Sequence, residues 1–300
     1  MNEYNNQIEN IDNNVIDGNE TYPVEFDDNP AMDLQEKMNL WLSESVISIK
    51  DLKMNFGDKQ VLKGINLEIQ SGQIIGYIGP NGAGKSTTVK ILLGILEGFQ
   101  GEVKVFGEDI SSGNIEYKKK IGYVPETAEM YDTLTAQEYL TFIGELYGMD
   151  FEIVDKKAQS LVSLFGIGDV YHSRISSFSK GMKQKVLIIA SLLHNPDILF
   201  FDEPLSGLDA NSVMIFKEII TELASQGKTI FYSSHIMEVV EKISNRIILI
   251  NGGQIVADGT FAELQKKSSE GSLEEIFNQL TGFNQYKEIA SDFISVLKEA

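Results

Sequence analysis

Cysteine is absent from the 300 residues of this chain, and long apolar runs are absent as well. Without cysteine the chain forms neither a disulfide bond nor a cysteine-ligated zinc site, as expected of a cytosolic protein. The longest apolar stretch, residues 186–201, is interrupted by His194, Asn195 and Asp197, so no membrane-spanning helix is predicted. The amino terminus has no basic segment followed by an apolar one, and we therefore expect no secretory signal.

Basic residues are also scarce. The chain carries 25 Lys and Arg residues against 44 Asp and Glu residues, which gives a net charge of −19. Proteins that bind DNA or RNA through its phosphates need clusters of Lys and Arg, so this balance disfavours nucleic acid as a direct partner. Eleven of the acidic side chains lie in residues 1–44 beside the single basic residue Lys37, so about half of the net charge belongs to this acidic leader.

The acidic leader has two predicted parts. Residues 1–28 are rich in Asn, Asp and Glu without an apolar period, which predicts disorder. Asn29 and Pro30 then have the residue types of a helix start, and apolar residues at helical spacing predict a short helix over 30–42. Two interpretations of this helix stay open: it docks onto a partner protein, or it packs on its own domain.

The remaining chain has the pattern of an α/β protein, and 42% apolar residues suit a globular fold. Short strands with turns dominate from residue 46, amphipathic helices dominate 127–180, and strands then alternate with helices up to about residue 260. This order predicts a mainly parallel sheet with a small antiparallel β subdomain and an inserted helical subdomain over 127–180. Residues 261–300 are expected to form a helical extension.

A complete phosphate-binding pattern lies between a predicted strand, 73–78, and a predicted helix, 86–96. It consists of Gly79, Pro80, Asn81, Gly82, Ala83, Gly84, Lys85, Ser86 and Thr87. The glycines let backbone N–H groups and the start of the following helix surround an anion. Lys85 is expected to reach the β- and γ-phosphates of a nucleotide, and Ser86 to bind Mg²⁺.

A second predicted strand, 198–201, ends in two carboxylates, Asp202 and Glu203. A phosphate-binding loop with Mg²⁺ needs a carboxylate at such a strand end, and we expect Asp202 to hold the ion through its water shell. Glu203 follows directly, where it can orient and polarise the water that attacks the γ-phosphate. The aromatic Phe56 precedes a predicted hairpin turn, where it either stacks on a nucleotide base or caps the sheet.

Further motifs, together with the phosphate-binding loop, span residues 46–259 and resemble the ABC-type ATPases. Residues 179–184, Ser-Lys-Gly-Met-Lys-Gln, are similar to the signature motif of that family, 206–209 to its D-loop, and His235 to its switch histidine. The resemblance implies that two such domains pair head to tail around two ATP molecules. Ser179 and Gly181 of one subunit would then face the γ-phosphate bound by the other, and Asp209 would link the two sites.

The resemblance also assigns roles within one subunit. Phe56 matches the base-stacking aromatic of the family, and His235 would clamp the γ-phosphate and the attacking water. The family commonly has glutamine where this chain has Glu126, a carboxylate that could bind Mg²⁺ directly but would repel the γ-phosphate. This departure and the Lys-Gly-Met of the signature resemble the ATPase subunits of bacterial exporters whose permease is a separate chain.

The functional expectation is an ATP-hydrolysing subunit, with ATP and Mg²⁺ as cofactors, that powers an exporter. It would bind a separate transmembrane permease at the cytoplasmic face of the cell membrane and pair with a second ATPase subunit. The alternative is a soluble ABC-type ATPase that acts on nucleic acid or the ribosome. A clamp that binds ATP without hydrolysis is disfavoured by the presence of Glu203 and His235.

Overall fold

The computed structural model describes residues 45–127, 129–268, 271–282 and 286–298. The predicted disorder over 1–28 and the predicted helix over 30–42 lie outside the described residues. No helix in the described ranges is both long and apolar enough to span a bilayer.

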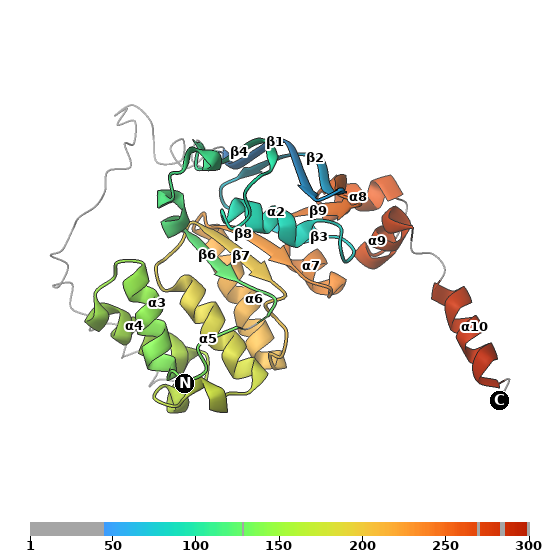
Figure 1. Cartoon of the computed structure of the whole chain (residues 1–300). Helices are drawn as coiled ribbons and strands as arrows, with labels where there is room; N and C mark the ends of the chain where they lie inside the picture. The colour runs from blue at the N-terminus through green and yellow to red at the C-terminus, as the bar shows by residue number, and fades with distance from the viewer. Residues whose placement is uncertain (1–44, 128, 269–270, 283–285, 299–300) are drawn as a thin grey trace. The chain divides into compact units, whose positions relative to one another are not determined.

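The larger sheet has six strands in the order β10-β9-β3-β8-β7-β6 (Figure 1). Its pairs are parallel except for the β9–β10 hairpin at one edge. The strand bounds are β3 (Ile74–Ile78), β6 (Ile121–Val124), β7 (Ile198–Asp202), β8 (Thr229–Ser233), β9 (Arg246–Asn251) and β10 (Gln254–Gly259). The predicted α/β fold with a mainly parallel sheet is thereby confirmed.

The parallel sheet is buried on both faces, as continuous apolar strands require. Successive residues of β3 alternate between two apolar cores: Ile74 and Ile78 belong to the core beneath the helices, whereas Ile75 and Tyr77 belong to the core shared with the second sheet. The strand that leads into the phosphate-binding loop is therefore packed against apolar side chains on both faces.

The second sheet is antiparallel, in the order β2-β1-β4-β5, as predicted. Its strands are β1 (Ser45–Phe56), β2 (Lys59–Gln70), β4 (Gln100–Val105) and β5 (Glu108–Asp109). Strand β2 is longer than the short strands that the sequence predicts from residue 46. The pairing of β1 with β2 shifts register near Leu52, and Gly64 on β2 has φ +94°. These irregularities interrupt the alternation of buried and exposed residues, so the sequence pattern does not show the full length of the strand.

The other elements of the described residues are helices. Their bounds are α2 (Lys85–Leu92), α3 (Ala136–Leu146), α4 (Phe151–Leu164), α5 (Lys180–Leu192), α6 (Ala210–Ser225), α7 (Met237–Ile243), α8 (Phe261–Ser268), α9 (Leu273–Thr281) and α10 (Tyr286–Lys298). The short 3₁₀ helices are η1 (Ile110–Ser112), η2 (Glu116–Lys120), η3 (Gly168–Val170) and η4 (Ile175–Ser177). The predicted helix over 86–96 is wrong at its end, because the chain turns at Gly94 with φ +61°.

The inserted helical subdomain is built around α3 and α4. Thr135 and Glu138 form a capping box at the start of α3, and Asp150 caps α4 by accepting hydrogen bonds from the N–H groups of Glu152 and Ile153. The chain therefore leaves β6 through the Glu126 loop, passes through this helical pair and returns along α5 to β7.

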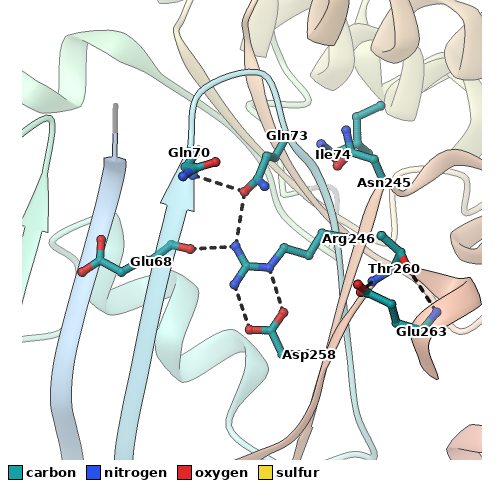
Figure 2. A network of polar contacts seen from close by, with 9 residues as sticks. All are labelled: Glu68, Gln70, Gln73, Ile74, Asn245, Arg246, Asp258, Thr260 and Glu263. Atoms are coloured by element: carbon teal, nitrogen blue, oxygen red, sulfur yellow. Dashed lines mark hydrogen bonds and ion pairs between the residues drawn. The ribbon is translucent and has the colours of Figure 1, made fainter. Parts of the chain in front are cut away.

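A polar network fixes the antiparallel sheet to the edge of the parallel sheet (Figure 2). Arg246 on β9 binds both carboxylate oxygens of Asp258 on β10, at 2.7 Å from Nε and 2.8 Å from Nη2. Its Nη1 donates to the carbonyl oxygen of Glu68 on β2 at 2.7 Å. Because the two-pronged guanidinium geometry is rigid, this contact holds the β1–β2 hairpin in a fixed place relative to β9 and β3.

Candidate functional site

The phosphate-binding loop is held by close backbone packing. A Cβ atom at Gly79 would lie 2.2 Å from the carbonyl oxygen of Ile250, and one at Gly84 would lie 2.6 Å from Leu62 Cδ2. Gly84 also has φ +114° as it caps α2. These two glycines are therefore required by packing against β9 and β2. Gly82 faces open space at φ +76°, which leaves its backbone free to approach a ligand.

The side chain of Lys85 lies over this loop. Its Nζ donates to the carbonyl oxygen of Gly79 at 2.6 Å and to that of Pro80 at 3.3 Å. Burial lowers the pKa of Lys85, while the carboxylates of Asp202, Glu203 and Glu126 act in the opposite direction. The ammonium is thus a partly desolvated cation inside the loop, which can stabilise the negative charge of a phosphate group.

Asp202 and Glu203 lie at the end of β7, beside the end of β8. The Ser233 hydroxyl donates to Asp202 Oδ1, and the N–H of Glu203 donates to the Ser233 carbonyl oxygen at 3.1 Å. Glu203 has φ +50°, an uncommon conformation for a residue with a side chain and one that is often found at functional sites. Strand pairing therefore sets the position of both carboxylates.

The Glu203 carboxyl group is surrounded by groups that can tune it. His235 Nε2 lies 3.5 Å from Oε1, and the Ser234 hydroxyl donates to Oε2 at 3.4 Å. Burial raises the pKa of Glu203, although the nearby His235 opposes the shift. A carboxylate with a raised pKa beside a histidine suits proton transfer from a water molecule.

One cavity of about 280 Å³ joins these groups. Its lining residues are Lys59, Val61, Asn81, Gly82, Gly84, Lys85, Ser86, Thr87, Glu126, Asp202, Glu203 and His235. Six of the nine predicted loop residues therefore share one site with the carboxylates and the switch histidine, whereas Gly79, Pro80 and Ala83 lie outside the lining. Sequence reasoning missed Lys59 and Val61, two residues of β2 that also line the cavity. The predicted Phe56 is exposed in the same hairpin but is not part of this lining.

The oxygen donors of this cavity fit the predicted Mg²⁺ ion. Ser86, Asp202 and Glu126 offer one hydroxyl group and two carboxylates, whereas the described residues contain no preformed cluster of three His, Cys, Asp or Glu ligands. Mg²⁺ on a nucleotide usually keeps several waters and takes one or two protein ligands besides the phosphates. The residues present therefore match an ion that arrives with its nucleotide.

Of the predicted site residues outside this cavity lining, Ser179, Gly181 and Asp209 lie near the starts of α5 and α6. Ser179 caps α5 by accepting from the N–H of Met182 at 3.2 Å, and Asp209 caps α6 by accepting from the N–H and hydroxyl of Ser212. The bonds from Ser212 lower the pKa of Asp209. Gly181 lies so close to the D-loop that a Cβ there would be 2.3 Å from the carbonyl oxygen of Gly207.

A phosphate-binding loop between β3 and α2, with paired carboxylates at the end of β7, defines the chain as a P-loop nucleotide hydrolase. The sequence profile described as ABC transporter matches residues 62–206. The ABC transporter ATP-binding protein NatA of Bacillus subtilis is 37% identical over 77% of this chain and 96% of its own length. The linearmycin resistance ATP-binding protein LnrL of the same organism is 36% identical, over 73% of this chain and 70% of its own.

Solved structures agree with these relatives. The structure of an ATP binding subunit of an ABC transporter superposes with a TM-score of 0.74 at 30% identity, over 79% of this chain and all of that one. The chain therefore belongs to the family of ABC transporter ATP-binding proteins, as the sequence motifs predict. It is an ATP-binding protein and an ATP hydrolase of the ABC type.

The role of Glu126, where the family commonly has glutamine, can be tested directly. We expect Glu126→Gln to leave substantial ATPase activity, because an amide still offers an oxygen to Mg²⁺ and removes a charge that repels the γ-phosphate. Steady-state phosphate release is the measurement, with Glu129→Gln in the same exposed loop as the matched control. A fall of more than about tenfold, roughly 1.4 kcal/mol, for Glu126→Gln alone would show that the carboxylate is a required part of the mechanism.

Proposed function

We propose that this chain is the ATPase subunit of a membrane exporter, bound at the cytoplasmic face of the membrane to a separate permease. The observation that carries the ATPase part of the proposal is the single cavity that unites Lys85, Asp202, Glu203 and His235. The export direction is supported by the exporter-like signature motif and by LnrL, a relative named for linearmycin resistance.

Within one subunit, the loop N–H groups and Lys85 would bind the β- and γ-phosphates of ATP, and Ser86 and Asp202 would hold Mg²⁺. The ion, when bound, neutralises phosphate charge and orients the γ-phosphate. Glu203 would orient the attacking water and accept its proton, and its raised pKa suits this task. His235, 3.5 Å from Glu203, would contact the γ-phosphate and keep the carboxylate in place.

The proposed domain architecture has an ATPase domain over 45–260, a helical subdomain over about 127–180 and a helical extension over 261–300. A head-to-tail pair of ATPase domains would bring Ser179 and Gly181 of one copy to the phosphates held by the other. The position of both residues outside the cavity lining of their own chain supports this arrangement. Phe56, exposed in the β1–β2 hairpin, would stack on the adenine base.

An exposed aromatic pair supports a docking site for the permease. Tyr131, which follows the Glu126 loop, meets Phe142 of α3 edge to face with ring centroids 6.1 Å apart. The exposed fractions are 63% for Tyr131, 39% for Phe142 and 67% for the nearby Leu146. Exposed apolar side chains gathered in this way are typical of protein interfaces. The patch links the loop that carries Glu126 to the helical subdomain, so a permease bound there could respond to the nucleotide.

Affinity purification from detergent-solubilised native membranes, in ATP and Mg²⁺, tests this proposal. The chain with Glu203→Gln should retain a stoichiometric polytopic membrane protein, which mass spectrometry identifies. Adding Tyr131→Ser and Phe142→Ser should release that protein without loss of ATP binding, whereas Leu164→Ser, on the exposed face of α4, should not. Recovery of only ribosomes, nucleic acid or soluble proteins would instead support the soluble ABC-type ATPase.

A further inference from the structure

The ATP cavity receives two residues from the antiparallel sheet. Lys59 and Val61, two residues apart on β2, both line it, so they share one face of the strand. Phe56 is the direct partner of Lys59 across the β1–β2 hairpin. Residues directly opposite each other in an antiparallel pair project from the same face of the sheet. Lys59 and Val61 therefore form the face of the hairpin that lines the cavity, and Phe56 lies opposite Lys59, outside that lining.

Lys59 is the member of this face with a charge. Three lysines of β1 and β4 are paired: Lys50 and Lys104 contact Glu102, and Lys53 contacts Asp51. In the described parts of the chain, the Lys59 ammonium has neither a hydrogen-bond acceptor nor a carboxylate partner, although it lines a cavity. An exposed cation that lines the cavity without a partner is available for a ligand, whereas Lys63 of the same strand lies outside the lining.

The charge distribution in the cavity favours a second cation. Glu126, Asp202 and Glu203 bring three carboxylates to the lining, and Lys85 is already bound to two loop carbonyls. A nucleoside triphosphate adds further negative charge along the whole phosphate chain. Lys85 comes from the start of α2 and Lys59 from the hairpin, so the two lysines reach the cavity from different elements.

We propose that Lys59 is a nucleotide-binding residue whose ammonium contacts the α- and β-phosphate end of the bound nucleotide, beside the base that Phe56 is proposed to hold. Lys59 pairs with Phe56 and lines the cavity together with the phosphate-binding loop, so its charge would lie between the proposed base position and the phosphates. This inference rests on the proposed orientation of ATP in the cavity. It assigns a role to a residue that no sequence motif of the site includes.

The test compares the dissociation constants of ATP, ADP and adenosine, measured by competition with a fluorescent ATP analogue. We expect Lys59→Met to weaken ATP and ADP about threefold to tenfold, as for a partly solvated charge contact, and to leave adenosine unchanged. Lys59→Arg keeps the charge and should bind all three ligands nearly as wild type does. The dependence of ATP affinity on salt should also be shallower in Lys59→Met.

The matched control is Lys63→Met, which removes an exposed lysine of the same strand that does not line the cavity. It should bind every ligand as wild type does, and thermal unfolding without nucleotide should be equal for all variants. Unchanged ATP affinity in Lys59→Met, or an equal loss for adenosine and ATP, would overturn the assignment. Failure of the wild-type chain to bind ATP would reject the cavity itself, which distinguishes that result from a failure of Lys59 alone.

Discussion

Glu203→Gln should lower the rate of ATP hydrolysis by about a hundredfold or more while ATP still binds, because a general base of this kind contributes 10²- to 10⁴-fold. Glutamine keeps the size of the side chain and a hydrogen-bond acceptor for Ser234 and His235, but it cannot accept the proton of the attacking water. Burial raises the pKa of the Glu203 carboxyl, so the group that is lost is a better base than an exposed carboxylate. Phosphate release and ATP affinity, measured on the same preparation, check both halves of the expectation.

A carboxylate outside the cavity provides the control for this result. Glu145→Gln on α3 removes an exposed carboxylate that does not line the ATP cavity, and its turnover should match wild type. If Glu203→Gln also turned over ATP at close to the wild-type rate, Glu203 would not be the base. The water would then be activated without this carboxylate, and the contact between Glu203 and His235 would serve only to hold the two side chains in place.

Sequence reasoning identified the cavity residues that belong to short, local sequence patterns. The phosphate-binding loop and the Asp202–Glu203 pair each follow a buried strand, and the carboxyl ends of parallel strands meet at one edge of a sheet. Their convergence on one cavity therefore follows from strand order alone. Lys59 shows the limit of this approach, because its place depends on the register of the hairpin and on the packing of one sheet against another.

The fold shows a similar division. The parallel strands and the α3–α4 pair follow from apolar periodicity and helix caps, which are local signals. The seven-residue helix α7 was not predicted, since it is too short to show a period, and the end of α2 was misplaced because the turn at Gly94 interrupts an apolar run. Long-range contacts such as that of Gly181 with Gly207 leave no local signal, although they decide which side chain fits.

Two variants that are each inactive should restore activity when mixed, if the subunits pair head to tail. Lys85→Met removes the cation from the phosphate-binding loop. The methyl group that Gly181→Ala adds would lie 2.3 Å from the carbonyl oxygen of Gly207, so the start of α5 and the D-loop must move apart. Each variant alone should lose about a hundredfold in turnover, as expected when one preorganised group at the phosphates is lost.

The recovery follows from symmetry. In a mixed dimer, one composite site carries both defects and the other carries neither, because the loop of one chain meets the signature motif of the other. With random exchange, half of the dimers are mixed and each has one intact site, so roughly a quarter of wild-type turnover should return. The measurement is phosphate release after equal amounts of the two variants are mixed and allowed to exchange subunits.

The matched control places both substitutions in one chain. Lys85→Met mixed with the double variant Lys85→Met, Gly181→Ala leaves every phosphate-binding loop defective and should recover nothing. Recovery in the first mixture but not in this one requires that the Gly181 segment acts on the nucleotide held by another subunit. Absence of recovery in the first mixture, with subunit exchange verified by labelled chains, would mean that the contact of Gly181 with Gly207 serves its own chain, and that the ATP site is completed in some other way.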